Sequence, residues 1–233
     1  MKLRSGFSLL ELIVVLTVIG IIGTFSYSKF TEIMMESKSE QLATQLNKVE
    51  VALNKYYSEL GTYPLDINWL LTDSMDDTSI KYDSLSLKME DGMEDPDVIN
   101  YWSGPYINDM KIVEKSLGKT VKAVFGDEII ICSKIEEDSD KSKISLCDED
   151  VSTAENYINV MLIKGIDTEA IKFLFKQING REMTDDDRKF GNALSVARGT
   201  GANKSDKLGV PARENYGDAT PFVIYRFTNN IQN

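Results

Sequence analysis

The sequence contains no histidine among its 233 residues. Without an imidazole, the chain has no Ser-His-Asp or Cys-His nucleophile pair and no histidine ligand for zinc or haem. Basic residues are also scarce, because the chain has 26 Lys and Arg but 37 Asp and Glu. The resulting net charge of -11 gives no overall attraction to a phosphate backbone. We therefore expect neither an enzyme nor a protein that binds nucleic acid directly.

The rest of the composition is that of an ordinary globular protein. Hydrophobic residues make up 42% of the chain and charged residues 27%, so neither wholesale disorder nor a multi-span membrane protein is expected. The length is sufficient for one or two domains with a folded core.

Apolar residues are concentrated at the start of the chain. From Phe7 to Phe25, 13 of 19 residues are large and apolar, and Glu11 is the only charged one. A helix of that length rises roughly 28 Å, close to the hydrocarbon thickness of a bilayer. Lys2 and Arg4 precede it, which places the N-terminus in the cytoplasm and the later residues outside. The stretch is too long for a secretory signal peptide, and no A-x-A-like triplet follows it, so an uncleaved single-span anchor is one interpretation.

A plain anchor does not explain Glu11. A carboxylate costs about 2.5 to 3.5 kcal/mol near the centre of a span and is a functional candidate by default. The run around it combines a short basic leader, a glycine before a phenylalanine, and a glutamate as the fifth residue counted from that phenylalanine. In these features it resembles the prepilin signature of type IV pilins and of the pseudopilins of type II secretion. The residues that carry the resemblance are Arg4-Ser5-Gly6-Phe7-Ser8-Leu9-Leu10-Glu11.

The resemblance implies three segments. Residues 1–6 would be a leader, removed by a membrane-embedded prepilin peptidase that cuts between Gly6 and Phe7 and N-methylates Phe7. Residues 7–29 would form the transmembrane and filament-core helix, and residues 30–233 an extracytoplasmic globular domain. In a fibre, the Glu11 carboxylate of one subunit would meet the Phe7 amine of a neighbour, offsetting the desolvation of both charges.

An amphipathic segment continues the apolar stretch without an intervening proline. Leu46, Val49, Leu53, Tyr56 and Leu60 follow a 3-4-3-4 spacing, which predicts one helix from Phe7 to Leu60 with one face toward a core. We expect Phe30, Ile33 and Met34 to extend that face upstream. Gly61 is placed to cap the helix, and Pro64 prevents its continuation.

The remaining chain predicts an antiparallel sheet with extra helices, so the expected fold class is α+β. Strands are expected at residues 121–125 and 128–135 around a Gly126-Asp127 turn, and at residues 221–227. A capping box at residues 152–155 predicts a helix that ends near Gly165, and Asp167 is expected to cap another helix that stops at Gly180. Residues 199–220 are expected to be an irregular loop.

Cys132 and Cys147 are the only cysteines. Both lie beyond the predicted span, where an oxidising exterior favours a disulfide, and two free buried thiols are the alternative. No metal site is expected. Calcium at the acidic stretches 91–97, 136–140 or 185–187 stays an open alternative, although none of them has the EF-hand spacing.

The leading hypothesis is a structural subunit of a type IV pilus or of a type II secretion pseudopilus. The resemblance implies a homo-oligomeric filament with other pilins or pseudopilins, and a prepilin peptidase, an assembly ATPase, a platform protein and in some cells a secretin as partners. The subunit would lie in the inner membrane as a single-pass protein and then in a periplasmic or cell-surface filament. The alternative is a minor tip subunit that binds a surface, a secreted substrate or a DNA-uptake partner.

Overall fold

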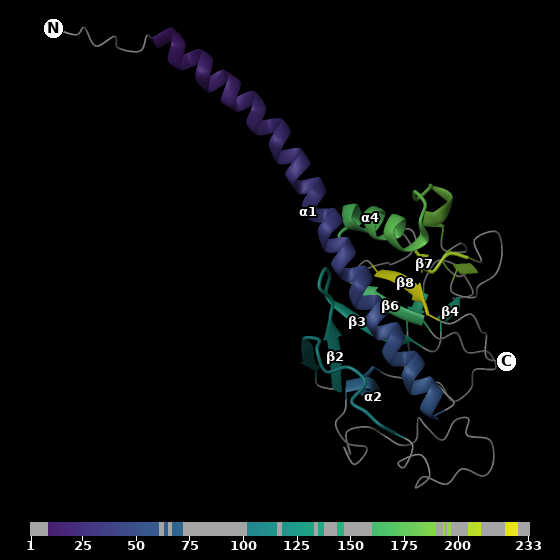
Figure 1. The fold of residues 1–233 in the computed structure, drawn as a ribbon. Coiled ribbons are helices and arrows are strands. Elements are labelled where there is room, and N and C mark those ends of the chain that lie inside the picture. Colours follow the sequence, from purple (N-terminus) through teal and green to yellow (C-terminus); the bar gives the residue numbers. More distant parts are fainter. Residues whose placement is uncertain are drawn as a thin grey trace, which may run out of the picture.

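The computed structural model describes residues 9–60, 63–64, 67–71, 102–115, 118–132, 135–137, 144–146, 160–189, 193, 195–196, 205–210 and 222–227. Helix α1, Leu9–Leu60, is a single element of 52 residues. No proline interrupts the sequence between its ends, so nothing breaks the ladder of i to i-4 hydrogen bonds. Figure 1 shows α1 as one long rod whose second half lies across the globular domain while its first half projects beyond it. The predicted continuous helix is confirmed from Leu9 onward.

The globular domain is built on one sheet of six antiparallel strands in the order β1-β2-β3-β6-β8-β7. A second hairpin pairs β4 with β5, and α4 packs against α1. This arrangement is the α+β fold that the sequence predicts. The strands are β1 (Ile112–Lys115), β2 (Gly118–Lys122), β3 (Glu128–Cys132), β4 (Ile135–Glu137), β5 (Ile144–Leu146), β6 (Val160–Lys164), β7 (Leu208–Gly209) and β8 (Phe222–Arg226). The helices besides α1 are α2 (Asn68–Leu71), α4 (Thr168–Asn179) and the short 3-10 turn η3 (Asp186–Arg188).

The core lies between α1 and one face of the sheet. The predicted helix stripe Leu46, Val49, Leu53, Tyr56 and Leu60 is buried there, and Leu42 extends it. Phe30, Ile33 and Met34, however, remain exposed, so their predicted place on the core face is wrong. At about 100° per residue they point away from the direction shared by Leu42, Leu46 and Leu53.

The connection between β2 and β3 contains the predicted Gly126-Asp127 turn, but it runs from residue 123 to residue 127. Val121 lies opposite Ile129 across the two strands. Gly126 has a φ of 131°, and a Cβ there would lie 2.9 Å from the carbonyl oxygen of Lys164, so glycine is required by both conformation and space. The strands themselves end earlier than predicted, at Lys122 and Cys132.

The helix expected to run from the capping box to Gly165 is wrong over Val160–Lys164, which forms strand β6. This strand pairs with β3 on one side and β8 on the other, and its first four residues are buried. A central strand covered on both faces has a continuous apolar sequence, which periodicity alone cannot distinguish from a buried helix. Residues 152–159 lie outside the described part of the chain.

Helix α4 begins and ends where the sequence predicts. The Asp167 carboxylate accepts a hydrogen bond from the N–H of Glu169 (2.8 Å), and Gly180 ends the helix with a φ of 71°. A two-residue strand, β7, lies within the expected loop 199–220, and β8 confirms the predicted last strand. Gly61 lies outside the described residues.

Candidate assembly site on helix α1

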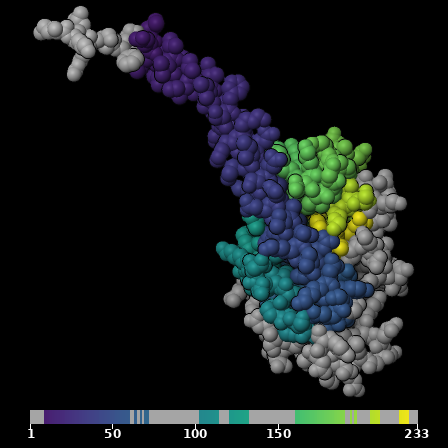
Figure 2. Space-filling model, viewed as in Figure 1, coloured from purple at the N-terminus to yellow at the C-terminus, as the bar shows by residue number. Residues whose placement is uncertain are grey.

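The first half of α1 has its apolar side chains exposed on every side. Leu9 is 78% exposed and Phe25 72%. Figure 2 shows this half free of the globular domain. By length and composition, α1 is the one helix of the described residues that could cross a membrane. So much exposed apolar surface requires a lipid or protein environment.

Glu11 lies in the first turn of α1. A carboxylate there interacts favourably with the partial positive charge of a helix N-terminus. Gly6 and Phe7, the predicted cleavage and methylation residues, lie outside the described residues. The pairing of Glu11 with Phe7 of a neighbour therefore stays a prediction.

Three hydroxyl groups along the apolar half are satisfied within the helix. Thr17, Thr24 and Ser28 each donate a hydrogen bond to the carbonyl oxygen three residues earlier, at 2.8, 2.8 and 3.0 Å. A hydroxyl paired in this way costs much less to bury in an apolar environment than a free one. These three hydroxyl groups are thus compatible with a lipid or filament-core environment.

The second half of α1 is attached to the domain by polar side chains as well as apolar ones. Ser39 donates a hydrogen bond to the carbonyl oxygen of Ala170 in α4 (3.2 Å). Gln45 donates to the carbonyl oxygen of Lys122 and accepts from the N–H of Val124, both at 2.8 Å. Gln45 therefore bonds to the β2–β3 turn as a neighbouring strand would, through one donor and one acceptor.

Two carboxylates of α1 form further attachments. Glu50 accepts hydrogen bonds from Tyr225 Oη (2.6 Å) and from Lys207 Nζ (2.9 Å). Burial, and then the hydrogen bond to Glu50, raise the pKa of Tyr225. Glu59 accepts from the hydroxyl of Tyr106 and from Ser103 Oγ (2.7 Å). Each carboxylate thus fixes a different part of the domain to the helix.

These four attachments were not predicted from the sequence. Their only sequence signal is the position of polar residues next to the buried stripe. Ser39, Gln45 and Glu50 are themselves buried, and a buried polar side chain needs a partner. Together they set both the rotation and the axial position of α1 on the sheet.

An ion cluster occupies the predicted acidic stretch 185–187. The Asp187 carboxylate accepts from Arg181 (2.6 and 2.8 Å) and from the N–H and hydroxyl of Thr184, both 2.8 Å. Arg181 also pairs with Asp206. The pKa of Asp187 is lowered chiefly by its hydrogen bonds with Arg181. The oxygens of Asp187 are therefore bound by donors of the chain itself.

Within the described ranges, no group of three or more Asp, Glu or Cys side chains is arranged to hold a metal ion. The acidic stretch 91–97 and residues 138–140 lie outside those ranges, so calcium binding there stays an open alternative.

The β4–β5 hairpin lies between the two cysteines in the sequence. Cys132 is the last residue of β3, and Cys147 follows directly after β5 but lies outside the described residues. Ile135 pairs with Leu146 across the hairpin. In this pairing Leu146, the residue before Cys147, lies opposite Ile135, which is three positions after Cys132. The predicted disulfide is consistent with this register and stays a prediction.

Comparison with known families agrees with the N-terminal pattern. The family model described as the prokaryotic N-terminal methylation motif matches residues 1–27. Comparisons with curated proteins and with solved structures gave no match. The motif indicates a structural, pilin-type family whose members are usually non-enzymatic, and together with the exposed apolar helix it fits a membrane-anchored pilin. The chain carries, at its N-terminus, the signature of type IV pilins and pseudopilins.

Proposed function

We propose that this protein is a structural subunit of a type IV pilus or a pseudopilus, processed between Gly6 and Phe7 and assembled through helix α1. The methylation motif at residues 1–27 supports the processing. In this proposal residues 1–6 are the leader, residues 7–29 the membrane and filament-core segment, and residues 30–233 the extracytoplasmic domain. The prepilin peptidase is the first partner, followed by an assembly ATPase, a platform protein and, in a double-membraned cell, a secretin.

The continuity of α1 is the observation that carries the proposal. One helix joins a half whose apolar side chains are exposed to a half that forms the core of the folded domain. The exposed half can be transferred from lipid to a bundle of identical helices without refolding the domain. A protein that stays in the membrane does not need the cleavage and methylation that this motif directs. The motif therefore supports a subunit that leaves the bilayer.

Processing gives the direct test. Intact mass spectrometry of the subunit from sheared native fibres should give a chain that begins at N-methylated Phe7. Replacing Gly6 with leucine should block the cut and leave a longer precursor in the membrane, whereas Ser5→Ala, a change in the leader one residue earlier, serves as the matched control. Full-length chain beginning at Met1 in assembled fibres would refute the proposal.

The second candidate is a minor tip subunit. The sequence between α2 and β1 supports it, because residues 73–97 carry nine acidic residues and two lysines, and a charged segment of this kind suits recognition of a partner. Quantitative mass spectrometry separates the candidates. A major subunit should dominate sheared fibres, whereas a tip subunit should be present at one or a few copies per fibre.

A further inference from the structure

The outer edge of β7, at one end of the six-stranded sheet, is closed by a side chain. The carbonyl oxygen of Lys207 accepts a hydrogen bond from the N–H of Arg226 in β8 (2.8 Å), so the N–H and carbonyl of the next residue, Leu208, point away from β8. Asn179 binds both groups. Its Oδ1 accepts from the Leu208 N–H (3.0 Å), and its Nδ2 donates to the Leu208 carbonyl oxygen (2.9 Å). The backbone of Leu208 is thus already occupied at this edge.

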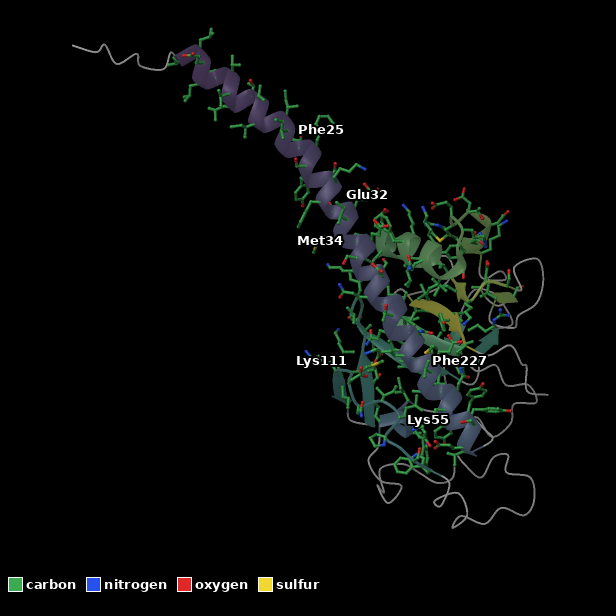
Figure 3. The ribbon with its side chains drawn as sticks, viewed as in Figure 1. Phe25, Glu32, Met34, Lys55, Lys111 and Phe227 are labelled. Carbon is green, nitrogen blue, oxygen red and sulfur yellow. The ribbon has the colours of Figure 1, made fainter. Side chains whose placement is uncertain are left out.

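The opposite edge of the sheet, on β1, is open. The N–H of Lys122 donates to the carbonyl oxygen of Lys111 (2.8 Å), so the backbone groups of Ile112 and Glu114 point away from β2. In the described part of the chain, no strand pairs with this side of β1. Figure 3 shows Lys111 at the outer margin of the domain. A strand edge with outward N–H and carbonyl groups is a template for a further strand.

The β4–β5 hairpin is a second element with open edges. Among the described residues its two strands pair only with each other. A two-stranded hairpin is marginally stable in water by itself, and a third strand stabilises it. Figure 1 shows β2 and β4 on opposite sides of the domain, with β6 and β8 between them, and β1 lies beyond β2 in the sheet order. Strands β1 and β4 of one chain therefore cannot pair with each other.

The two open edges have opposite charge in the sequence. Residues 111–122, which include β1 and β2, carry four lysines and one glutamate, a net charge of +3. Residues 135–140, which include β4, carry four acidic residues and no lysine or arginine, a net charge of -4. Like charges on adjacent strands repel each other. Charge therefore disfavours β1 against β1 and β4 against β4, and it favours β1 against β4.

We propose that β4 of one copy of this chain pairs with the outer edge of β1 in the next copy, so that the hairpin of one subunit extends the sheet of another. This inference rests on the proposed function and specifies a contact between the globular domains. Because it joins two different surfaces, the contact is head-to-tail and can repeat along an open helical filament. Pairing of the same edge in both copies would stop at a dimer.

The pairing is short, which suits a contact made inside an assembly. Strand β1 has four residues and β4 has three, so one pairing forms few hydrogen bonds, and each contributes little net free energy. In a fibre the subunits are already held next to one another, which raises the effective concentration of each edge for the other. We therefore expect the pairing in fibres rather than between dispersed subunits.

Site-specific photocross-linking in the native cell tests the proposal. The full chain would carry a photoreactive benzoyl-phenylalanine in place of Lys111, or in place of Gln177, an exposed residue of α4, as the matched control. In sheared fibres the Lys111 probe should give a dimer of this chain whose cross-linked peptide maps to residues 133–147. The Gln177 probe should give that product at least about tenfold less.

Proline substitution separates strand pairing from charge attraction alone. Glu114→Pro removes an N–H that points away from β2, so the β1–β2 pairing keeps its hydrogen bonds while the outer edge loses a donor. The ratio of fibre to membrane-pool subunit should fall about fivefold or more. Glu114→Gln keeps the N–H and should leave the ratio unchanged. An equal ratio in the two variants would overturn the inference.

Charge reversal gives a third readout, in which rescue excludes a folding defect. Lys111→Glu with Lys115→Glu should lower the same ratio about fivefold or more, and so should Glu136→Lys with Glu137→Lys. All four changes in one chain should restore the ratio to within about twofold of wild type.

The absence of rescue would overturn the inference, and so would cross-links from Lys111 only to another part of the chain or to a different protein. If correctly processed subunits form fibres in which the Lys111 probe does not reach residues 133–147, only this inference fails. If the chain is neither cleaved at Phe7 nor found in fibres, the proposed function fails with it.

Discussion

Glu50 of α1 and Tyr225 of β8 are joined by a 2.6 Å hydrogen bond within the interface between the long helix and the sheet. The two residues are 175 positions apart in sequence, so this contact connects the first element of the fold to its last strand. Lys207 binds the same carboxylate. The position of α1 on the sheet therefore depends on a polar contact as well as on burial of apolar side chains.

Replacement of Glu50 by alanine should destabilise the domain. It leaves the Tyr225 hydroxyl buried without its acceptor, which costs about 1–3 kcal/mol. Urea unfolding of the detergent-solubilised chain, followed by the fluorescence of its two tryptophans, measures the change in the free energy of unfolding. Glu36→Ala, on the exposed side of the same helix, is the matched control and should change it by less than about 0.5 kcal/mol.

Stability should fall at alkaline pH. The pKa of Tyr225 is raised above its ordinary value of 10.0, mainly by burial and then by Glu50. A raised pKa means that the folded state holds the proton more strongly, so this stabilisation is complete below about pH 10 and is lost as pH rises beyond it. Tyr225→Phe should reduce the slope of stability against pH between about pH 10 and 12. An equal slope in both proteins would contradict the assignment.

The Arg181–Asp187 pair should make the domain sensitive to acid. The pKa of Asp187 is lowered from its ordinary value of 3.8, chiefly by Arg181. The corresponding stability is present above about pH 4 and is lost as pH falls below that value. Asp187→Asn should cost about 1.5–3 kcal/mol at pH 7, typical of hydrogen bonds to charged groups, and the difference from wild type should shrink near pH 2. Asp185→Asn, whose side chain makes no capping hydrogen bond, is the control.

Glu11→Gln should impair assembly and leave membrane insertion and cleavage intact. If the carboxylate pairs with the Phe7 amine of a neighbour, its removal leaves that amine uncompensated in an apolar core, at a cost of about 3–5 kcal/mol for a buried pair. A plain anchor predicts the opposite, because a span with one charge fewer inserts more easily. The measurement is the ratio of fibre to membrane-pool subunit at equal expression. An unchanged ratio would show that Glu11 is not the assembly contact.

Cys132 and Cys147 should be found in one linked species by non-reducing peptide mapping. The β4–β5 register, with Ile135 opposite Leu146, brings the chain before Cys147 back toward the end of β3. Closing a loop of this size contributes about 3 kcal/mol in the chain-entropy model, so reduction should lower the melting temperature of the domain. Free thiols at both positions in protein from the cell envelope would refute the pairing.

Local signals predicted the parts of the fold that depend on neighbouring residues. The absence of proline before Pro64 and the spacing from Leu46 to Leu60 predicted α1, and the caps at Asp167 and Gly180 predicted α4. The same signals could not identify β6, because four consecutive apolar residues suit either a buried helix or a central strand. Only pairing with β3 and β8 decides between them.

The contacts that attach α1 to the domain could not be predicted at all, because their partners are far away in the sequence. Gln45, Glu50 and Glu59 bind residues 77, 175 and 47 positions away, and no spacing rule predicts such partners. The same limit explains the error at Phe30, Ile33 and Met34. Their apolar character was clear from the sequence, but the rotation that turns them outward is set by contacts further along the helix. The motif at residues 1–27, by contrast, needs no tertiary contact to be identified.

The placement of Ser39, Gln45, Glu50 and Glu59 along α1 also determines how the domain bears mechanical load. Ser39 and Glu59 are 20 residues apart, roughly 30 Å along the helix axis, with Gln45 and Glu50 between them. A pull on the N-terminal end acts along that axis and nearly parallel to the interface with the sheet. The attachments are then loaded together in shear, whereas a force across the helix would open them one after another. Helix α1 can thus transmit tension from the membrane end of the subunit to α4, the β2–β3 turn, β8 and the Ser103–Tyr106 loop at the same time.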